Sequence, residues 1–63
     1  MSLLKKGDKL TDGDLLYEIT AVEDRAIRYN EIHLDGEVIS RISSRIGFEI
    51  DVIKGDLVRV EVR

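Results

Sequence analysis

Fourteen of the 63 residues are isoleucine or valine, and the chain contains no proline. β-Branched side chains favour extended backbone, because two heavy atoms on Cβ restrict χ1 and pack well on a pleated surface. Glycine and aspartate separate the apolar runs, as Gly7-Asp8, Gly13-Asp14, Asp35-Gly36 and Gly55-Asp56. Both residue types are suited to tight turns. The pattern predicts an all-β domain built from hairpins.

The first clear hairpin is predicted over residues 15–32. Alternation over residues 15–22 indicates a strand, and residues 23–25 form the expected turn. The return strand has Ile27 and Tyr29 on one face, but its next apolar residue, Ile32, has the opposite parity. A strand that keeps one face on a core needs a β-bulge to accommodate such a slip, which we expect near Asn30-Glu31.

Two further hairpins are predicted in the second half of the chain. Asp35-Gly36 is typical of a type I′ turn. Residues 48–52 and 58–62 each alternate strictly between apolar and charged side chains, with the turn at Lys54-Gly55-Asp56 between them. This ribbon has one apolar face, which at least one further layer of sheet must cover.

Residues 40–46 are ambiguous between strand and helix. Ser40 is a suitable N-cap, Ile42 and Ile46 are four residues apart, and Gly47 is a suitable stop signal, so we expect one short helical turn. Residues 3–10 are expected to form a short edge strand and loop. The predicted fold of residues 1–63 is one small, closed or partly open barrel of five to six antiparallel strands, SH3-like or oligonucleotide-binding-like.

Composition excludes several classes of site. No cysteine is present, so disulfides and thiolate chemistry are excluded, and a single histidine excludes a histidine-rich metal site. The net charge of −3 is spread along the chain, which argues against broad phosphate-backbone binding. No apolar run is long enough to span a membrane and the first residues contain no signal-peptide core, so we expect a soluble cytoplasmic protein with no membrane partner.

His33 is the one candidate for acid–base chemistry. With Asp35 and the nearby Ser40, Ser43 and Ser44, a Ser-His-Asp grouping can be drawn. A general base needs a cleft and a nucleophile within hydrogen-bond reach, and a barrel this small has little room for a substrate pocket. We therefore expect an exposed His33, no enzymatic activity and no small-molecule substrate.

Asp8, Asp12 and Asp14, with Gly7 and Gly13 beside them, superficially resemble a calcium loop. The twelfth loop position counted from Asp8 is Ile19, where such a loop needs a bidentate glutamate. Turn chemistry explains these aspartates better, so no metal and no cofactor is expected.

Arg25, Arg28, Arg41 and Arg45 could gather into a small basic patch. Single-stranded nucleic acid binding would need exposed aromatic rings beside that patch. Strand parity instead places the only three aromatic residues, Tyr17, Tyr29 and Phe48, in the core. Nucleic acid is therefore not the expected partner.

Residues 36–62 carry a more organised pattern. Gly36-Glu37-Val38-Ile39-Ser40, then Ile46-Gly47, then Lys54-Gly55-Asp56 leading into Leu57–Val62 resembles the AbrB/MazE-type swapped-hairpin module. The resemblance covers less than half of the chain and implies an intertwined dimer that binds DNA. The sequence departs from the family in its longer interval between Gly47 and Gly55, its lack of proline before the helix and its lack of a basic DNA face.

Three hypotheses about function follow. The favoured one is a non-enzymatic binding or assembly module that contacts a protein partner or itself, like small accessory proteins of phages and mobile elements. The alternatives are a designed barrel scaffold without a natural function and a DNA-binding dimer of the swapped-hairpin type. Leu16, Ile53 and Leu57 fall on the polar side of their predicted strands, so they are the expected contact surface.

Overall fold

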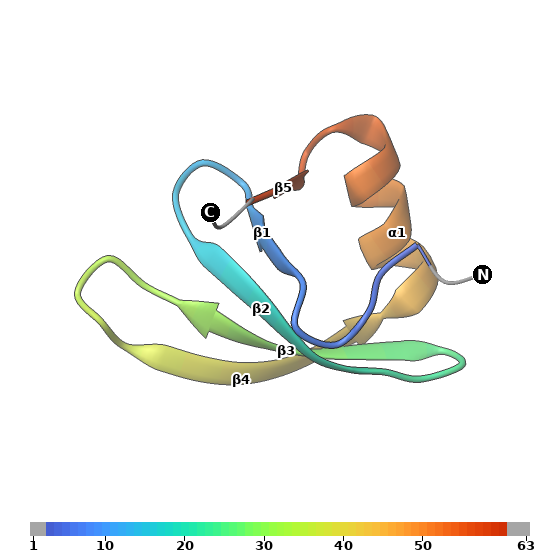
Figure 1. Cartoon of the computed structure of the whole chain (residues 1–63), viewed down its shortest axis with the longest axis horizontal. Helices are drawn as coiled ribbons and strands as arrows, with labels where there is room; N and C mark the ends of the chain where they lie inside the picture. The colour runs from blue at the N-terminus through green and yellow to red at the C-terminus, as the bar shows by residue number, and fades with distance from the viewer. Residues whose placement is uncertain (1–2, 61–63) are drawn as a thin grey trace.

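The computed structural model describes residues 3–60, which form one antiparallel sheet and one helix (Figure 1). The strands are β1 (Lys9–Thr11), β2 (Leu16–Val22), β3 (Ala26–Ile32), β4 (Val38–Ser44) and β5 (Val58–Arg59), and the helix α1 (Arg45–Lys54) lies between β4 and β5. The five strands are ordered β4-β3-β2-β1-β5. The predicted β-rich, antiparallel architecture is confirmed. The sheet is not closed, since β4 and β5 are its two ends.

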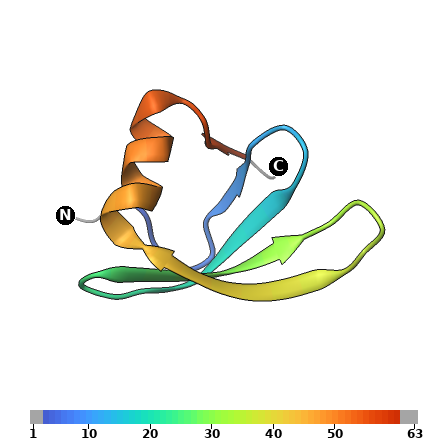
Figure 2. The same ribbon diagram turned by 180° about the vertical axis from the view of Figure 1, so that it is seen from behind.

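α1 covers one face of the curved sheet, which we call the inner face (Figures 1 and 2). The core lies between them. Its buried members come from the N-terminal segment, from β1, β2 and β3, from α1 and from the loop before β5: Leu4, Leu10, Ile19, Ile27, Tyr29, Phe48 and Leu57. Tyr17, Val22 and Val52 pack against this cluster from partly exposed positions. The inward orientation predicted for the three aromatic residues is confirmed.

The predicted bulge near Asn30-Glu31 is wrong. β3 pairs with β4 without a register shift, and the irregularity lies in β2, between Ile19 and Ala21. Ile32 pairs with Leu16 on one side and Val38 on the other. Because Ile32 is an odd number of residues from Tyr29, it lies on the outer face of the sheet. The change of apolar parity in β3 is therefore a change of face and not a slip in register.

The turn between β3 and β4 is not of type I′. The Gly36 N–H donates to the His33 carbonyl at 3.0 Å, so Leu34 and Asp35 are the central residues. Type I′ needs positive φ at both central residues, but among the described residues only glycines have it, here Gly36 with a φ of 91°. The turn therefore ends with a left-handed glycine, the usual arrangement of a hairpin loop that is longer than two residues.

Residues 40–54 differ most from expectation. β4 continues as a strand to Ser44, so the predicted helical turn over 40–46 is wrong. α1 then occupies the predicted strand over 48–52. The Ser44 hydroxyl caps the helix by accepting from the Gly47 N–H at 3.3 Å. Gly55 ends the helix in the left-handed region, with a φ of 87° and its N–H directed at the carbonyls of Asp51 and Val52.

The N-terminal segment is bonded into the sheet. The Gly7 N–H donates to the Ile19 carbonyl at 2.8 Å, and the Ile19 N–H donates to the Asp8 carbonyl at 2.9 Å. The Arg59 guanidinium reaches back to the Asp8 carboxylate at 2.9 Å and to the Leu3 carbonyl. β1 is therefore an interior strand between β2 and β5, and the predicted edge position for residues 3–10 is wrong. Within residues 3–60, no helix is long and apolar enough to cross a bilayer.

Two glycine substitutions test the helix that the structure has in place of the first strand of the hairpin predicted over residues 48–62. Gly47→Ala should stabilise the protein by about 0.5 kcal/mol, because alanine has the higher helix propensity and the new Cβ would lie 3.7 Å from the nearest atom, Ser44 Cβ. Gly55→Ala should cost about 1–2 kcal/mol, because alanine avoids the left-handed region. Urea unfolding of both variants tests this, and a destabilised Gly47→Ala would contradict the helix.

Candidate functional site

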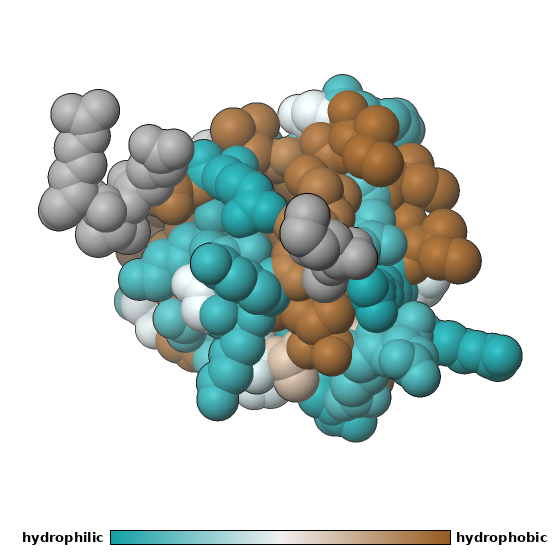
Figure 3. Space-filling view, turned by 45° about the vertical axis from the view of Figure 1, so that its right-hand side comes forward, coloured by the Kyte–Doolittle hydropathy of each residue, from teal (hydrophilic) through white to brown (hydrophobic). Residues whose placement is uncertain are grey.

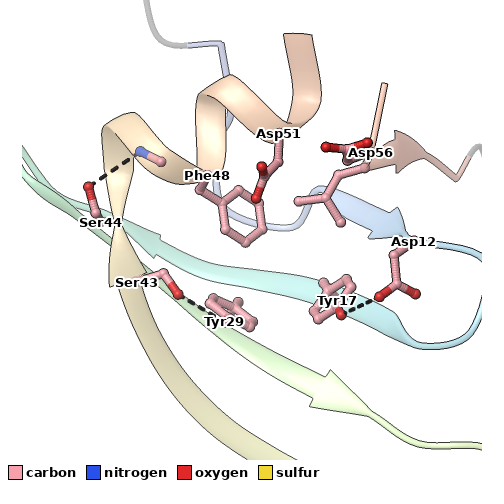
Figure 4. Close-up of a pocket in the computed structure, with 10 residues that line it drawn as sticks. Asp12, Tyr17, Tyr29, Ser43, Ser44, Phe48, Asp51 and Asp56 are labelled. Carbon is pink, nitrogen blue, oxygen red and sulfur yellow. Dashed lines mark hydrogen bonds between the residues drawn. The ribbon is translucent and has the colours of Figure 1, made fainter. Parts of the chain in front are cut away.

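A pocket of about 560 Å³ opens between α1 and the inner face of the sheet (Figure 4). Three kinds of side chain line it. The aromatic ones are Tyr17, Tyr29 and Phe48, the acidic ones are Asp12, Asp51 and Asp56, and the hydroxyls are those of Ser43 and Ser44. Leu57 and Gly47 complete the wall. The volume falls in the range of ordinary ligand sites, about 300–1,000 Å³.

The three aromatic rings come from β2, β3 and α1 and contact one another. Tyr17 and Tyr29 have centroids 5.6 Å apart at 74°, and Tyr29 and Phe48 have centroids 5.2 Å apart at 51°. Tilted and edge-to-face contacts of this kind are the arrangements that ring quadrupoles favour. Tyr29 and Phe48 are buried, so Tyr17 is the ring most open to the pocket. The Tyr29 hydroxyl is satisfied by Ser43 Oγ at 3.0 Å.

Asp12 is held rigidly at one side of the pocket. One of its carboxylate oxygens accepts the backbone N–H groups of Asp14 and Leu15, each at 2.9 Å, and the other accepts the Tyr17 hydroxyl at 2.8 Å. The backbone N–H groups of Leu15 and Asp14, and then the Tyr17 hydroxyl, lower the pKa of Asp12 below its ordinary value. Burial, followed by the same hydrogen bond, raises the pKa of Tyr17. The pair is therefore a carboxylate and a neutral phenol at neutral pH.

The other two aspartates lie at the α1 side of the pocket, on α1 and just after it (Figure 4). The Asp51 carboxylate makes no hydrogen bond or ion pair with another residue of the described segment. Asp56 approaches Lys54 Nζ at 3.4 Å, with both side chains 62% exposed, where ion pairs contribute little. Among the residues that the structure describes, no lysine or arginine lines the pocket. The polar wall that these residues form is therefore anionic.

The residues predicted as a contact surface are not brought together. Leu57 is buried in the core and lines the pocket. Ile53 is 75% exposed on the far side of α1. Leu16 lies on the outer face of the sheet, opposite Ile32. Ile53 and Leu16 thus belong to two separate apolar surfaces, and Leu57 to neither.

The arginines of the predicted basic patch are divided between surfaces. Arg28 and Arg41 have opposite parities, since Arg28 pairs with Ile42 and Arg41 pairs with Tyr29. Three of the guanidinium groups meet carboxylates of the same chain: Arg28 with Glu23 at 2.6 Å, Arg41 with Glu31 at 2.9 Å, and Arg45 with Glu49 at 3.5 Å. Arg25 is exposed in the turn between β2 and β3. Their charge is largely compensated locally.

His33 and the serines form no catalytic grouping. His33 Nε2 is 2.7 Å from the Glu31 carboxylate, which also binds Arg41. Ser43 bonds with Tyr29, and Ser44 caps α1. Ser40 donates to Asn30 on the outer face. None of the three hydroxyls has His33 as its described partner.

Asp8, Asp12 and Asp14 do not form a metal site. Within residues 3–60, no group of three or more acidic, histidine or cysteine residues could hold an ion.

α1 has a second apolar side that the core does not use. Phe48 and Val52 face the sheet, whereas Ile46, Ile50 and Ile53 are 70%, 47% and 75% exposed on the opposite side of the helix. In the space-filling view, apolar side chains form a brown band over the α1 side of the molecule (Figure 3). Exposed apolar stripes of this kind are typical of interaction surfaces.

Comparison with protein-family models, with curated proteins and with solved structures finds no match to this chain. The assignment of the candidate site therefore depends on the geometry of this structure alone.

The sequence contains a partial signal for the site, since Ser44 and Gly55 are standard helix caps. Those caps place Phe48, Asp51 and Asp56 on one side of the pocket. The alternation over residues 48–52 indicates a strand, so the sequence alone did not bring these three residues together.

The hydrogen bonds that the Asp12 carboxylate accepts predict a specific acid sensitivity. A carboxyl group whose pKa is lowered in the folded state contributes stability above its ordinary pKa, and that contribution is lost as pH falls through the folded-state value. Asp12→Asn should therefore be less stable than the wild type near neutral pH and should lose less stability on acidification. Urea midpoints at neutral and acidic pH test this. Asp14→Asn is the matched control, and equal acid sensitivity in Asp12→Asn and the wild type would contradict the prediction.

Proposed function

We propose that the chain is a non-enzymatic protein-binding module whose pocket holds a cationic side chain of its partner. The observation that carries the proposal is the composition of the pocket wall. Asp12, Asp51 and Asp56 line it together with Tyr17, and no basic residue of the described segment, 3–60, lies there to neutralise them. An arginine or lysine side chain matches this wall in charge, and its aliphatic stem matches the aromatic floor.

The arrangement of the wall favours a side chain of arginine or lysine length. Asp12 is fixed by three hydrogen bonds, so its charge is pre-organised and no side-chain entropy is lost when a cation arrives. The Asp51 carboxylate, which has no partner within residues 3–60, offers a second contact from α1. Planar guanidinium groups bind carboxylates with two parallel hydrogen bonds and stack on aromatic rings, so arginine fits better than lysine.

Binding suits this pocket better than catalysis does. A hydrolytic site needs a nucleophile next to a general base. The two serine hydroxyls in the wall are committed to Tyr29 and to the cap of α1, and His33 bonds with Glu31 instead.

For the fold, we propose the partly open, SH3-like barrel that the sequence predicts. The return of β5 to β1 after α1 supports it, because the first and the last strand then pair in one sheet.

The proposal predicts selective binding of positively charged side chains. Titration of the ¹⁵N-labelled protein with N-acetyl-arginine amide should shift the amide signals of Gly47 and Phe48, with dissociation constants in the millimolar range. Asp51→Asn and Asp56→Asn should each weaken binding about two- to five-fold, the contribution of one exposed charge pair. Glu37→Gln removes the same charge from an exposed residue outside the pocket and should leave binding unchanged.

N-acetyl-citrulline amide separates charge from shape, because citrulline has the length of arginine without its charge. Weaker binding of citrulline supports the proposal. Equal binding of the two compounds, or equal losses in Glu37→Gln and Asp51→Asn, would show that the pocket does not recognise a cation.

A further inference from the structure

The two edges of the sheet differ in their protection against pairing with another strand. β5 is two residues long, whereas β4 has seven. An edge strand is usually blocked by shortness, proline, charged side chains or a bulge. β4 contains no proline, and its one charged side chain, Arg41, is paired with Glu31 of β3 at 2.9 Å. β4 pairs with β3 over all seven residues without a register shift. Along residues 3–60, β3 is its only neighbour in the sheet, and both ribbon views show its other side uncovered (Figures 1 and 2).

The hydrogen bonds at the two ends of the β3–β4 pair determine which residues of β4 point outward. The His33 N–H donates to the Glu37 carbonyl at 2.8 Å, and the Arg45 N–H donates to the Arg25 carbonyl at 3.0 Å. Bonded and non-bonded pairs alternate in an antiparallel ladder, and the register keeps that alternation throughout. The N–H and C=O groups of Val38, Ser40 and Ile42 therefore point away from β3, toward the free edge.

We propose that this edge binds a second copy of the chain, through antiparallel pairing of β4 with β4 about a two-fold axis at Ser40. Ser40 of one copy then faces Ser40 of the other, and Val38 faces Ile42 at both ends of the contact. These are the residues whose backbone groups point outward, so each pair exchanges two backbone hydrogen bonds.

The side chains of β4 favour this register. Val38 and Ile42 are 55% and 56% exposed in the single chain, and in the dimer they cover one another on the outer face. Arg41, on the inner face, lies opposite Ile39 of the second copy and keeps its own partner, Glu31, at 2.9 Å. A register that places Ser40 opposite Ile42 would instead set Arg41 against Arg41, and like charges in facing positions are destabilising.

Because the side chains of β4 complement those of a second β4 in this register, a second copy of the chain fits the open edge better than an unrelated extended peptide does. The dimer is independent of the proposed function, because β4 contributes only Ser43 and Ser44 to the pocket. Arginine binding and dimerisation can therefore fail separately, because the NMR titration reports the first and sedimentation reports the second.

Opposite charges at the two-fold axis provide the test. Ser40 is exposed on the outer face, so lysine or glutamate there leaves the core unchanged. The wild-type chain should sediment as a dimer in the micromolar to millimolar range. Ser40→Lys and Ser40→Glu alone should each sediment as monomers, because identical charges meet at the axis. An equimolar mixture of the two variants should restore the dimer, and salt should weaken this mixed dimer.

Circular dichroism and thermal melting of each variant exclude unfolding as the cause of any loss. Val58→Lys adds the same charge at the other edge of the sheet and should remain dimeric. A wild type that stays monomeric at millimolar concentration would overturn the proposal. A dimer that neither Ser40 variant disrupts would also overturn it, and would place the contact on another surface, such as the exposed isoleucines of α1.

Discussion

The contact of Phe48 with the two tyrosine rings is the interaction on which the rest of the structure depends. Phe48 is the one buried side chain of α1, and its ring centroid lies 5.2 Å from that of Tyr29 and 6.5 Å from that of Tyr17. These contacts fix α1 on the inner face of the sheet. The helix in turn directs the chain back to β1, where β5 pairs. The pocket is the space left between the same three rings and the carboxylates around them.

A chain of this length can bury only a modest core, and the consequences are visible on its surface. Seven side chains are buried among the described residues, and small domains generally bury a lower share of their surface than large ones do. Apolar side chains that the core cannot accommodate appear on the outer side of α1 and along β4. Both surfaces are therefore direct results of the small size of the domain, and both are suited to contact with other molecules.

The hairpin of β2 and β3 was predictable because its signals are local. Alternation placed Tyr17, Ile19, Ile27 and Tyr29 on one face, and the structure confirms that face as the core side. α1 was not predictable by the same reasoning. Phe48 and Val52 lie two strand repeats apart and also one helical turn apart, so both structures bring them to the same side. The pocket was missed for this reason, since half of its wall comes from α1 and the loop that follows.

The sequence by itself determined the extended backbone of the first hairpin, the positions of most turns and the inward direction of the aromatic rings. Side-chain branching, alternation and glycine placement act over a few residues, so their effects can be recognised from the sequence alone. Only the tertiary structure decided that residues 45–54 are helical, that Asp12 converges with Asp51 and Asp56, and that β4 is left as an open edge. Each of these depends on contacts between residues distant along the chain, and the energy of such contacts overrides a local preference that two structures satisfy equally well.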